Sequence, residues 1–351
     1  MNKKLIAMAV AAGLAAPLAA HAEATVYGQL QIELQNIDVK ESAATDGIVV
    51  NPGSYVGQVT QPGGNTAIAD NKRGRLGVKG SEDLGDGLKA IYKFEWQVNT
   101  ANANVDDGDR ESYVGLSGNW GTFMAGALKS PYKYTGGVTY DPLVTTAGEA
   151  RRYGGMTTGT FGHNGFFTNA VGYMTPKIGG FSAWVGYVPD NTDGANGSNS
   201  WDIKYGAKNW EVFIAQANYL DSTTDNSNFT ANKAGGKVTF GMFTILGQYE
   251  MTTDQTGPGG GDDKGTLGFL GLQAKLGKNM LVAQGGSGKV DFDASTTDQT
   301  NTYYALGWIY KFTKQTRAFV TYRSTDVSDA DGTSGAKNES TAASAGMRID
   351  F

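Results

Sequence analysis

Two segments of the chain alternate between apolar and polar residues along their length. In 25–34 the even positions are Val, Gly, Leu, Ile and Leu, whereas the odd positions are Thr, Tyr, Gln, Gln and Glu. In 88–99 the even positions are Leu, Ala, Tyr, Phe, Trp and Val, with mostly polar residues between them. Because successive side chains of a strand point to opposite faces, each segment predicts a strand with one apolar and one polar face. Each is about ten residues long, which suits the ~9–11 residues of a tilted strand that crosses a bilayer.

The same pattern continues along the chain and predicts sixteen strands. They cover residues 25–34, 73–80, 88–99, 110–118, 121–127, 166–175, 181–188, 200–207, 210–219, 233–241, 243–251, 266–276, 279–287, 302–312, 316–324 and 340–351. Short connections, such as 277–278, alternate with long polar ones, such as 325–339. An even number of strands with tight turns at one end and long loops at the other is typical of a transmembrane barrel. We therefore expect an all-β, antiparallel up-and-down barrel with short periplasmic turns and long external loops.

The first 22 residues have the features of a secretory signal peptide. Lys3 and Lys4 precede the apolar segment 5–18, and Ala-His-Ala at 20–22 is a cleavage site of the A-x-A type. Residues 23–351 then form a single barrel domain. Cleavage removes two lysines, so the net charge falls from −5 to −7, and His163 is the one histidine that remains. Beyond residue 22 no apolar run approaches the ~18 residues of a spanning helix.

Composition excludes several other functions. The chain has no cysteine, which rules out disulfides, thiolate metal sites and cysteine nucleophiles. Its acidic balance argues against nucleic-acid binding. With one histidine left and no Gly-x-Ser-x-Gly motif, an outer-membrane hydrolase is disfavoured. We expect no enzyme activity, no cofactor and no metal.

Two further classes compete with the barrel. A soluble β-sandwich would leave about half of its strands with an apolar row facing water. A calcium-binding or adhesive surface protein would use acidic loops such as 190–193 and 261–263, which lack EF-hand spacing. The glycine-rich segment 257–265 lacks the Gly-Lys-Ser/Thr ending of a phosphate loop. The barrel accounts for more of the chain than either class.

Three blocks of sequence resemble the Gram-negative general porin family. RGRLGVKGSEDLGDGLKA at 73–90 is similar to that family's second strand, first tight turn and third strand. RESYVGL at 110–116 and AGMRIDF at 345–351 are similar to its fourth and last strands, so the resemblance spans the mature chain. It implies an outer-membrane homotrimer with one water-filled pore per subunit, in contact with membrane lipid and lipopolysaccharide. The terminal Phe351 would be the signal that the barrel-insertion machinery reads.

The resemblance also implies where solutes are selected. The family folds its third loop, here 128–165, into the lumen, where loop carboxylates face wall arginines. The residues that we expect at this constriction are Arg75, Arg110, Asp141, Glu149, Arg151 and Arg152, and those expected on the pore wall are Gln29, Lys79, Arg317 and Arg323. The sequence departs from the family twice: Phe166-Phe167, near His163, replace a third wall arginine, and Gln29 replaces a basic residue.

Opposed acids and bases across a water-filled gap create a transverse field that orients dipolar solutes. The charges near the expected constriction lean basic, because Lys129 and Lys133 add to the arginines. This predicts passive diffusion of small hydrophilic solutes and ions, tilted towards anions if Arg151 and Arg152 both line the constriction. A substrate-specific porin with a binding site in the channel is the alternative, and a pH gate at His163 is a further hypothesis.

Overall fold

The computed structural model describes residues 22–42, 65–70, 73–106, 110–150, 166–189, 197–221, 227–254, 262–293, 295–329, 334–335 and 337–351. Nearly all regular structure in these ranges is β-strand, as the alternation predicts. Two short helices, α2 (Pro131–Tyr134) and α3 (Gly137–Tyr140), interrupt the third loop. No helix in the described ranges has the length and apolar content needed to cross a membrane.

The strands follow one another along the chain. The first nine are β1 (Ala22–Ser42), β2 (Asn65–Ala69), β3 (Arg75–Gly85), β4 (Leu88–Asn99), β5 (Asn104–Asp106), β6 (Ser112–Gly118), β7 (Gly121–Lys129), β8 (Phe166–Met174) and β9 (Phe181–Val188). The others are β10 (Ser198–Gly206), β11 (Trp210–Asp221), β12 (Ser227–Phe240), β13 (Phe243–Asp254), β14 (Asp263–Leu276), β15 (Asn279–Asp291), β16 (Gln299–Lys311), β17 (Thr316–Ser328) and β18 (Lys337–Asp350).

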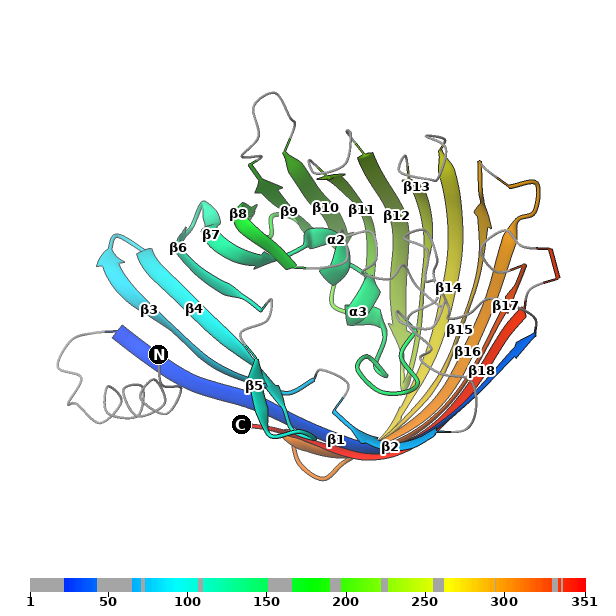
Figure 1. Ribbon diagram of the computed structural model, residues 1–351. Helices are drawn as coiled ribbons and strands as arrows, with labels where there is room; N and C mark the ends of the chain where they lie inside the picture. The colour runs from blue at the N-terminus through cyan, green and yellow to red at the C-terminus, as the bar shows by residue number, and fades with distance from the viewer. Residues whose placement is uncertain are drawn as a thin grey trace.

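These segments form a closed barrel of sixteen strands. Two of the sixteen are each split in two, because β2 and β3 both pair with β1, and β5 and β6 both pair with β4. Every successive pair is antiparallel, and β18 pairs with β1 to complete the ring. Closure leaves no strand edge to be satisfied in lipid. The arrangement, seen in Figure 1, agrees with the predicted fold.

The closing seam places the last residue against the first strand. Phe351 and Gly28 exchange two backbone hydrogen bonds of 2.8 and 3.0 Å. A Cβ at Gly28 would lie 2.3 Å from the ring of Phe351, so only glycine leaves room for that ring. Phe351 itself is 53 % exposed on the outside of the barrel. The terminal ring therefore has a packing role in closure.

The two faces of the strands have opposite polarity. In β1, Leu30, Ile32 and Leu34 are exposed, whereas Gln31 and Glu33 between them are 3 % and 1 % exposed. The pattern of one outward apolar row recurs in the other strands, with exposed leucine, isoleucine, valine and aromatic side chains around the ring. An apolar outward band is what hydrocarbon requires. The predicted faces of these strands are therefore those that the barrel uses.

Several strands are longer than the alternation predicts. β1 continues to Ser42 instead of ending at residue 34, and β17 continues to Ser328 instead of 324. The additional residues are largely polar. The alternation of apolar and polar residues marks only the part of a strand that faces lipid. Backbone hydrogen bonds between the strands continue beyond the membrane, where both faces can be polar. At the opposite end the turn between β3 and β4 is tight, with positive φ at Asp86 and Gly87.

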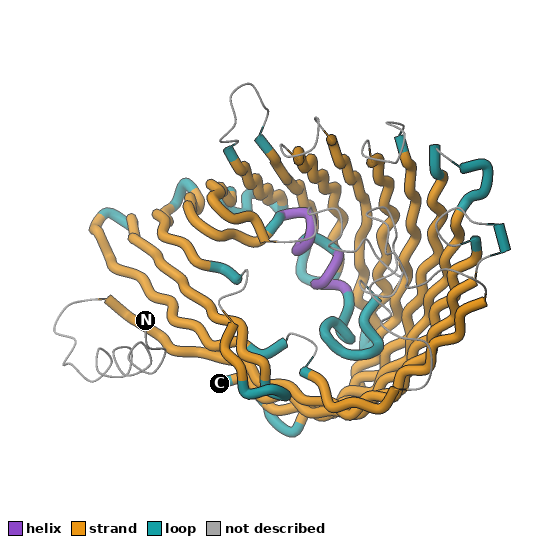
Figure 2. The backbone as a smooth tube through the Cα atoms, viewed as in Figure 1, coloured by secondary structure: helices purple, strands orange, loops and turns teal. Residues whose placement is uncertain are grey.

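The described part of the third loop, up to residue 150, lies inside the ring, against one half of its inner wall. Figure 2 shows its two helices within the barrel. Tyr140, Leu143 and Ala150 of this loop belong to one buried apolar cluster with inward side chains of the wall. Those wall residues include Phe213, Leu246, Leu267, Phe269, Val282, Tyr303 and Phe319, from β11 and β13 to β17. This buried apolar cluster therefore lies between loop and wall.

Candidate functional site

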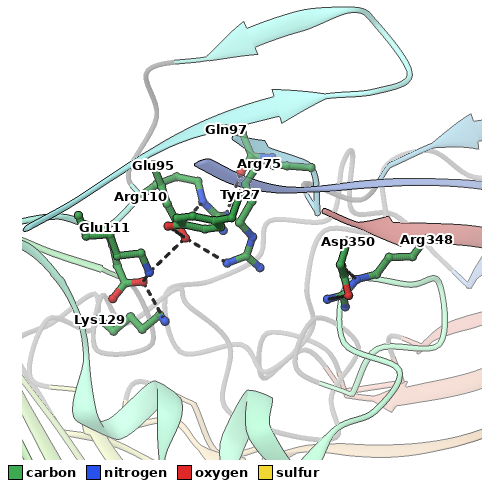
Figure 3. A network of polar contacts seen from close by, with 11 residues as sticks. Tyr27, Arg75, Glu95, Gln97, Arg110, Glu111, Lys129, Arg348 and Asp350 are labelled. Atoms are coloured by element: carbon green, nitrogen blue, oxygen red, sulfur yellow. Dashed lines mark hydrogen bonds and ion pairs between the residues drawn. The ribbon is translucent and has the colours of Figure 1, made fainter. Parts of the chain in front are cut away.

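A buried carboxylate on β4 holds together the basic side chains of the opposite half of the wall. Glu95 lies 3.2 Å from Lys93, 3.3 Å from Arg110 and 3.6 Å from Arg75, measured between nitrogen and oxygen. Tyr27 donates its hydroxyl to Glu95 at 2.7 Å. Figure 3 shows the guanidinium groups of Arg75 and Arg110 converging on this carboxylate. Three cations share one anion, so the group carries net positive charge.

Glu111 extends this network towards the third loop. It forms an ion pair with Lys93 and a second one, of 2.8 Å, with Lys129 at the end of β7. Arg110 also donates from Nη1 to Gln97 at 3.1 Å. We call Arg75, Lys93, Arg110, Lys129, Glu95 and Glu111 the Glu95 network. It contains four cations and two carboxylates.

The strand register explains why these side chains meet. Arg75 pairs with Gln97, and Lys79 pairs with Lys93, across the β3–β4 ladder. Odd positions of both strands therefore point to the same side of the sheet, inward, because the exposed Phe94 lies on an even position. Lys79 is exposed and its ammonium lies 5.1 Å from the ring centre of Tyr27.

A second basic group continues the row around the wall. Arg317 donates to Asp350 at 3.0 Å and Arg348 donates to the same carboxylate at 2.6 Å. Arg317 and Arg348 are register partners, and Gln29 pairs with both Asp350 and Arg75. The polar row therefore runs from β17 through β18 and β1 to β3, with Gln29 at its centre.

The two loop acids are buried inside the loop, 2 % and 0 % exposed for Asp141 and Glu149. Asp141 accepts hydrogen bonds from the amides of Leu143 and Ala150, both 2.8 Å, and from Gln284 of β15 at 2.9 Å. Glu149 accepts the amide of Thr145 at 2.7 Å. In the described ranges the acidic partner of both Arg75 and Arg110 is instead the wall carboxylate of Glu95.

The environment of Asp141 changes its acidity. Burial raises the pKa of Asp141 to about 6, and the neighbouring Glu149 carboxylate acts in the same direction, against the stabilising amide donors. Protonation of Asp141 near pH 6 is therefore coupled to the conformation of the loop.

Arg323 anchors the tip of the loop and is fully buried. Its Nε donates to the carbonyl of Ala147 at 2.9 Å, and its other nitrogens donate to Thr325 and Ser340. Tyr303 donates to the carbonyl of Gly148 at 2.6 Å. A wall arginine thus lies under the loop, whereas Arg317 on the same strand remains about one quarter exposed.

The helical part of the loop is fastened to β10 and β13. Tyr132 donates its hydroxyl to Glu250 at 2.7 Å, and Thr135 donates to Asp202 at the same distance. The amide of Gly137 donates to Gln248, also at 2.7 Å. The chain thus holds the loop by buried hydrogen bonds as well as by the apolar cluster.

Sequence reasoning singled out Arg75 and Arg110 but did not single out Lys93, Glu95 or Glu111. A signal existed, because Lys93 and Glu95 lie on the polar row of the predicted strand 88–99. Three other residues, Arg151, Arg152 and His163, lie outside the described residues, as do all but the last of the predicted signal peptide. The described part of the chain contains no group of three or more His, Asp or Glu side chains suited to a metal ion.

A closed barrel with an apolar exterior, a charged inner wall and a loop folded inside defines the class of transmembrane β-barrels. The family model described as Gram-negative porin matches residues 7–330. The chain therefore belongs to the Gram-negative porin family. That membership confirms the predicted resemblance and makes the protein a porin and not an enzyme.

Relatives of known identity agree. The chain is 33 % identical over 258 residues to the major outer membrane protein P.IB of Neisseria gonorrhoeae, covering 73 % of this chain and 62 % of that protein. It is 30 % identical over 261 residues to P.IB of Neisseria lactamica, covering 71 % of this chain and 67 % of that protein. The matched region thus spans somewhat less than two thirds of the gonococcal protein.

Solved structures share the fold. The anion-selective porin from Comamonas acidovorans superposes with a TM-score of 0.72 at 20 % identity, covering 94 % of this chain and all of that one. Salmonella typhi OmpF, solved with daunomycin, gives a TM-score of 0.65 at 14 % identity, covering 94 % and 98 % of the two chains. These likenesses confirm the sixteen-stranded barrel.

Proposed function

We propose that the protein forms a water-filled channel in the outer membrane of a Gram-negative bacterium, through which small hydrophilic solutes and ions diffuse passively. The observation that carries this proposal is the opposite polarity of the two barrel faces, for example Leu30 and Ile32 outward against Gln31 and Glu33 inward. A sixteen-stranded barrel is wide enough for an aqueous interior. Family membership points the same way.

The narrowest part of this channel would lie between the third loop and the Glu95 network. Arg75 and Arg110 are the wall charges in this proposal, with Arg151 and Arg152 as further cations from the loop. Asp141 and Glu149 would act on the channel from inside the loop, since their carboxylates are buried. Their field would still reach the lumen, because buried charges are weakly screened by salt.

The channel would prefer anions modestly. Four cations against two carboxylates in the Glu95 network leave an excess of positive charge on the wall. Lumen charges of one sign raise the local concentration of the opposite ion. The expected preference for anions therefore does not depend on Arg151 and Arg152.

The assembly expected from the family is a homotrimer in contact with lipid and lipopolysaccharide, inserted by recognition of Phe351. Crosslinking of the detergent-solubilised protein tests the first part. Insertion of a variant without Phe351 into native outer membranes tests the second.

Planar-bilayer recording of the purified protein tests the channel itself. We expect stepwise conductance in KCl and, across a salt gradient, a zero-current potential whose sign reports a modest chloride preference. Electrically silent membranes would refute the channel, and a strong potassium preference would refute the anion tilt alone.

A further inference from the structure

Beside the Glu95 network, aromatic rings and cations alternate. The ring of Phe166 lies 6.3 Å from that of Tyr134, measured between centroids, at an angle of 57°. Lys133 lies 4.6 Å and Arg110 5.7 Å from the centre of the Phe166 ring, and Lys129 lies 4.7 Å from that of Tyr134. We call these five residues the ring–cation cluster.

Four separate segments supply the cluster. Arg110 precedes β6, Lys129 ends β7, Lys133 and Tyr134 belong to α2, and Phe166 begins β8. Lys129 and Phe166 are register partners. The cluster therefore lies where the third loop leaves the wall, and both of its rings are partly exposed. Tyr132, two residues before Tyr134, is by contrast buried against the wall.

The ring of Phe166 changes what this place can bind. A fourth cation at this position would strengthen attraction for any anion. A ring beside cations adds a flat apolar surface, which discriminates between anions of equal charge by the shape of their carbon skeleton.

We infer that the ring–cation cluster is a binding site for aromatic carboxylates, a solute class more specific than the anions in general that the proposed channel admits; the inference rests on that proposed function. The carboxylate would be drawn by Arg110 and Lys129, as charge-assisted hydrogen bonds are the strong ones, and the buried Lys133 would add its charge. The aromatic ring of the solute would stack or meet edge-on with Phe166 and Tyr134. Glu111 limits the affinity by holding Lys129, which suits a solute that must leave again.

Two solutes of equal charge and similar size separate this site from general anion attraction. Benzoate has a planar aromatic ring, whereas cyclohexanecarboxylate has a saturated one. In bilayers carrying the full-length protein in KCl, we expect benzoate to block the current at about fivefold lower concentration, the size of one aromatic pair contact. Equal block by both solutes would overturn the inference.

Variants assign the difference to the rings. Phe166→Leu and Tyr134→Leu should each remove most of the fivefold preference, whereas Phe166→Tyr, which keeps an aromatic face, should retain it. Phe240→Leu, on the exposed outer face, is the matched control and should retain it as well. A preference that persists in both leucine variants would overturn the site. If the unmodified protein carries no KCl current, the proposed channel is refuted. If it carries KCl current but benzoate and cyclohexanecarboxylate block it equally, this inference alone is refuted.

Discussion

The two halves of the inner wall differ in what their inward side chains meet. On β11 and β13–β17, inward Phe213, Leu246 and Phe269 are covered by the third loop and belong to the large buried apolar cluster. On β3–β7, the inward side chains include those of the Glu95 network, where cations and carboxylates pair with one another, and a smaller apolar cluster with Met124 and Leu128. One half therefore holds the loop and the other presents charge to the interior.

The difference follows from the cost of desolvation. Apolar side chains gain free energy when the loop excludes water from them. Charged side chains lose free energy under such a cover unless they are fully paired, so they favour a wall that remains hydrated. Arg323 is a charged side chain that the loop does cover, and there the carbonyl of Ala147 and the hydroxyls of Thr325 and Ser340 accept its hydrogen bonds.

The largest expected effect comes from removing the buried guanidinium of Arg323. Arg323→Met leaves the carbonyl of Ala147 without its charged donor and should destabilise the docked loop by about 3 kcal/mol. Single-channel recordings should then show a larger and noisier conductance. Arg317→Met, on the same strand but paired with Asp350 away from the loop, is the control. An unchanged conductance in Arg323→Met would contradict the anchoring role.

A smaller effect is expected from the helical anchor. Tyr132→Phe removes the hydroxyl that donates to the buried carboxylate of Glu250, which should cost about 2 kcal/mol. Amide hydrogen exchange in residues 132–141 should accelerate, since the helices detach more often. Tyr304→Phe, on the exposed outer face, should leave this exchange unchanged. Equal exchange in Tyr132→Phe and the unmodified protein would show that the apolar cluster alone holds the helices.

The third effect depends on pH. The pKa of Asp141 is raised to about 6 in the docked loop, so this loop binds a proton more readily than an undocked one with an ordinary carboxyl. The docked state therefore gains stability as pH falls through 6, by about 1 kcal/mol between pH 7 and pH 5, and loses it as pH rises. The open-channel current noise should therefore decrease as the pH is lowered from 7 to 5.

Two substitutions isolate this carboxyl. Asp141→Asn should make the noise independent of pH between 5 and 7. Asp86→Asn, in the β3–β4 turn, should preserve the pH dependence of the unmodified protein. Noise that rises on acidification would reverse the sign and contradict the role of Asp141.

The smallest effect concerns the charged half. Glu95→Gln removes one negative charge from the Glu95 network while keeping an acceptor for Tyr27. The chloride-to-potassium permeability ratio should rise roughly twofold, because the screened interaction of one charge in a hydrated pore is below about 1 kcal/mol. The zero-current potential measures it, with the exposed Glu82→Gln near the turn as the control. A shift towards potassium would contradict the positive balance of the wall.

Resemblance and alternation predicted part of the site. Arg75 was found by its motif and its inward position by the two-residue period. The pairing of Arg110 with Glu95 was not, because it depends on which strands are neighbours and on where Arg110 stands before β6. The inward apolar side chains of β11 and β13–β17, such as Phe213 and Phe269, lie on rows that were expected to be polar, since the pattern does not say that a loop covers them.

The sequence by itself determined the strands, their two faces and the barrel, because the alternation that specifies them is local and every strand repeats it. Only the tertiary structure decided which half of the wall the third loop covers. Arg323 and Ala147, which fasten that loop, are 176 residues apart in the chain. Their contact depends on barrel closure, and on the exclusion of water from apolar side chains that many different strands supply. No local sequence pattern encodes a contact of this kind.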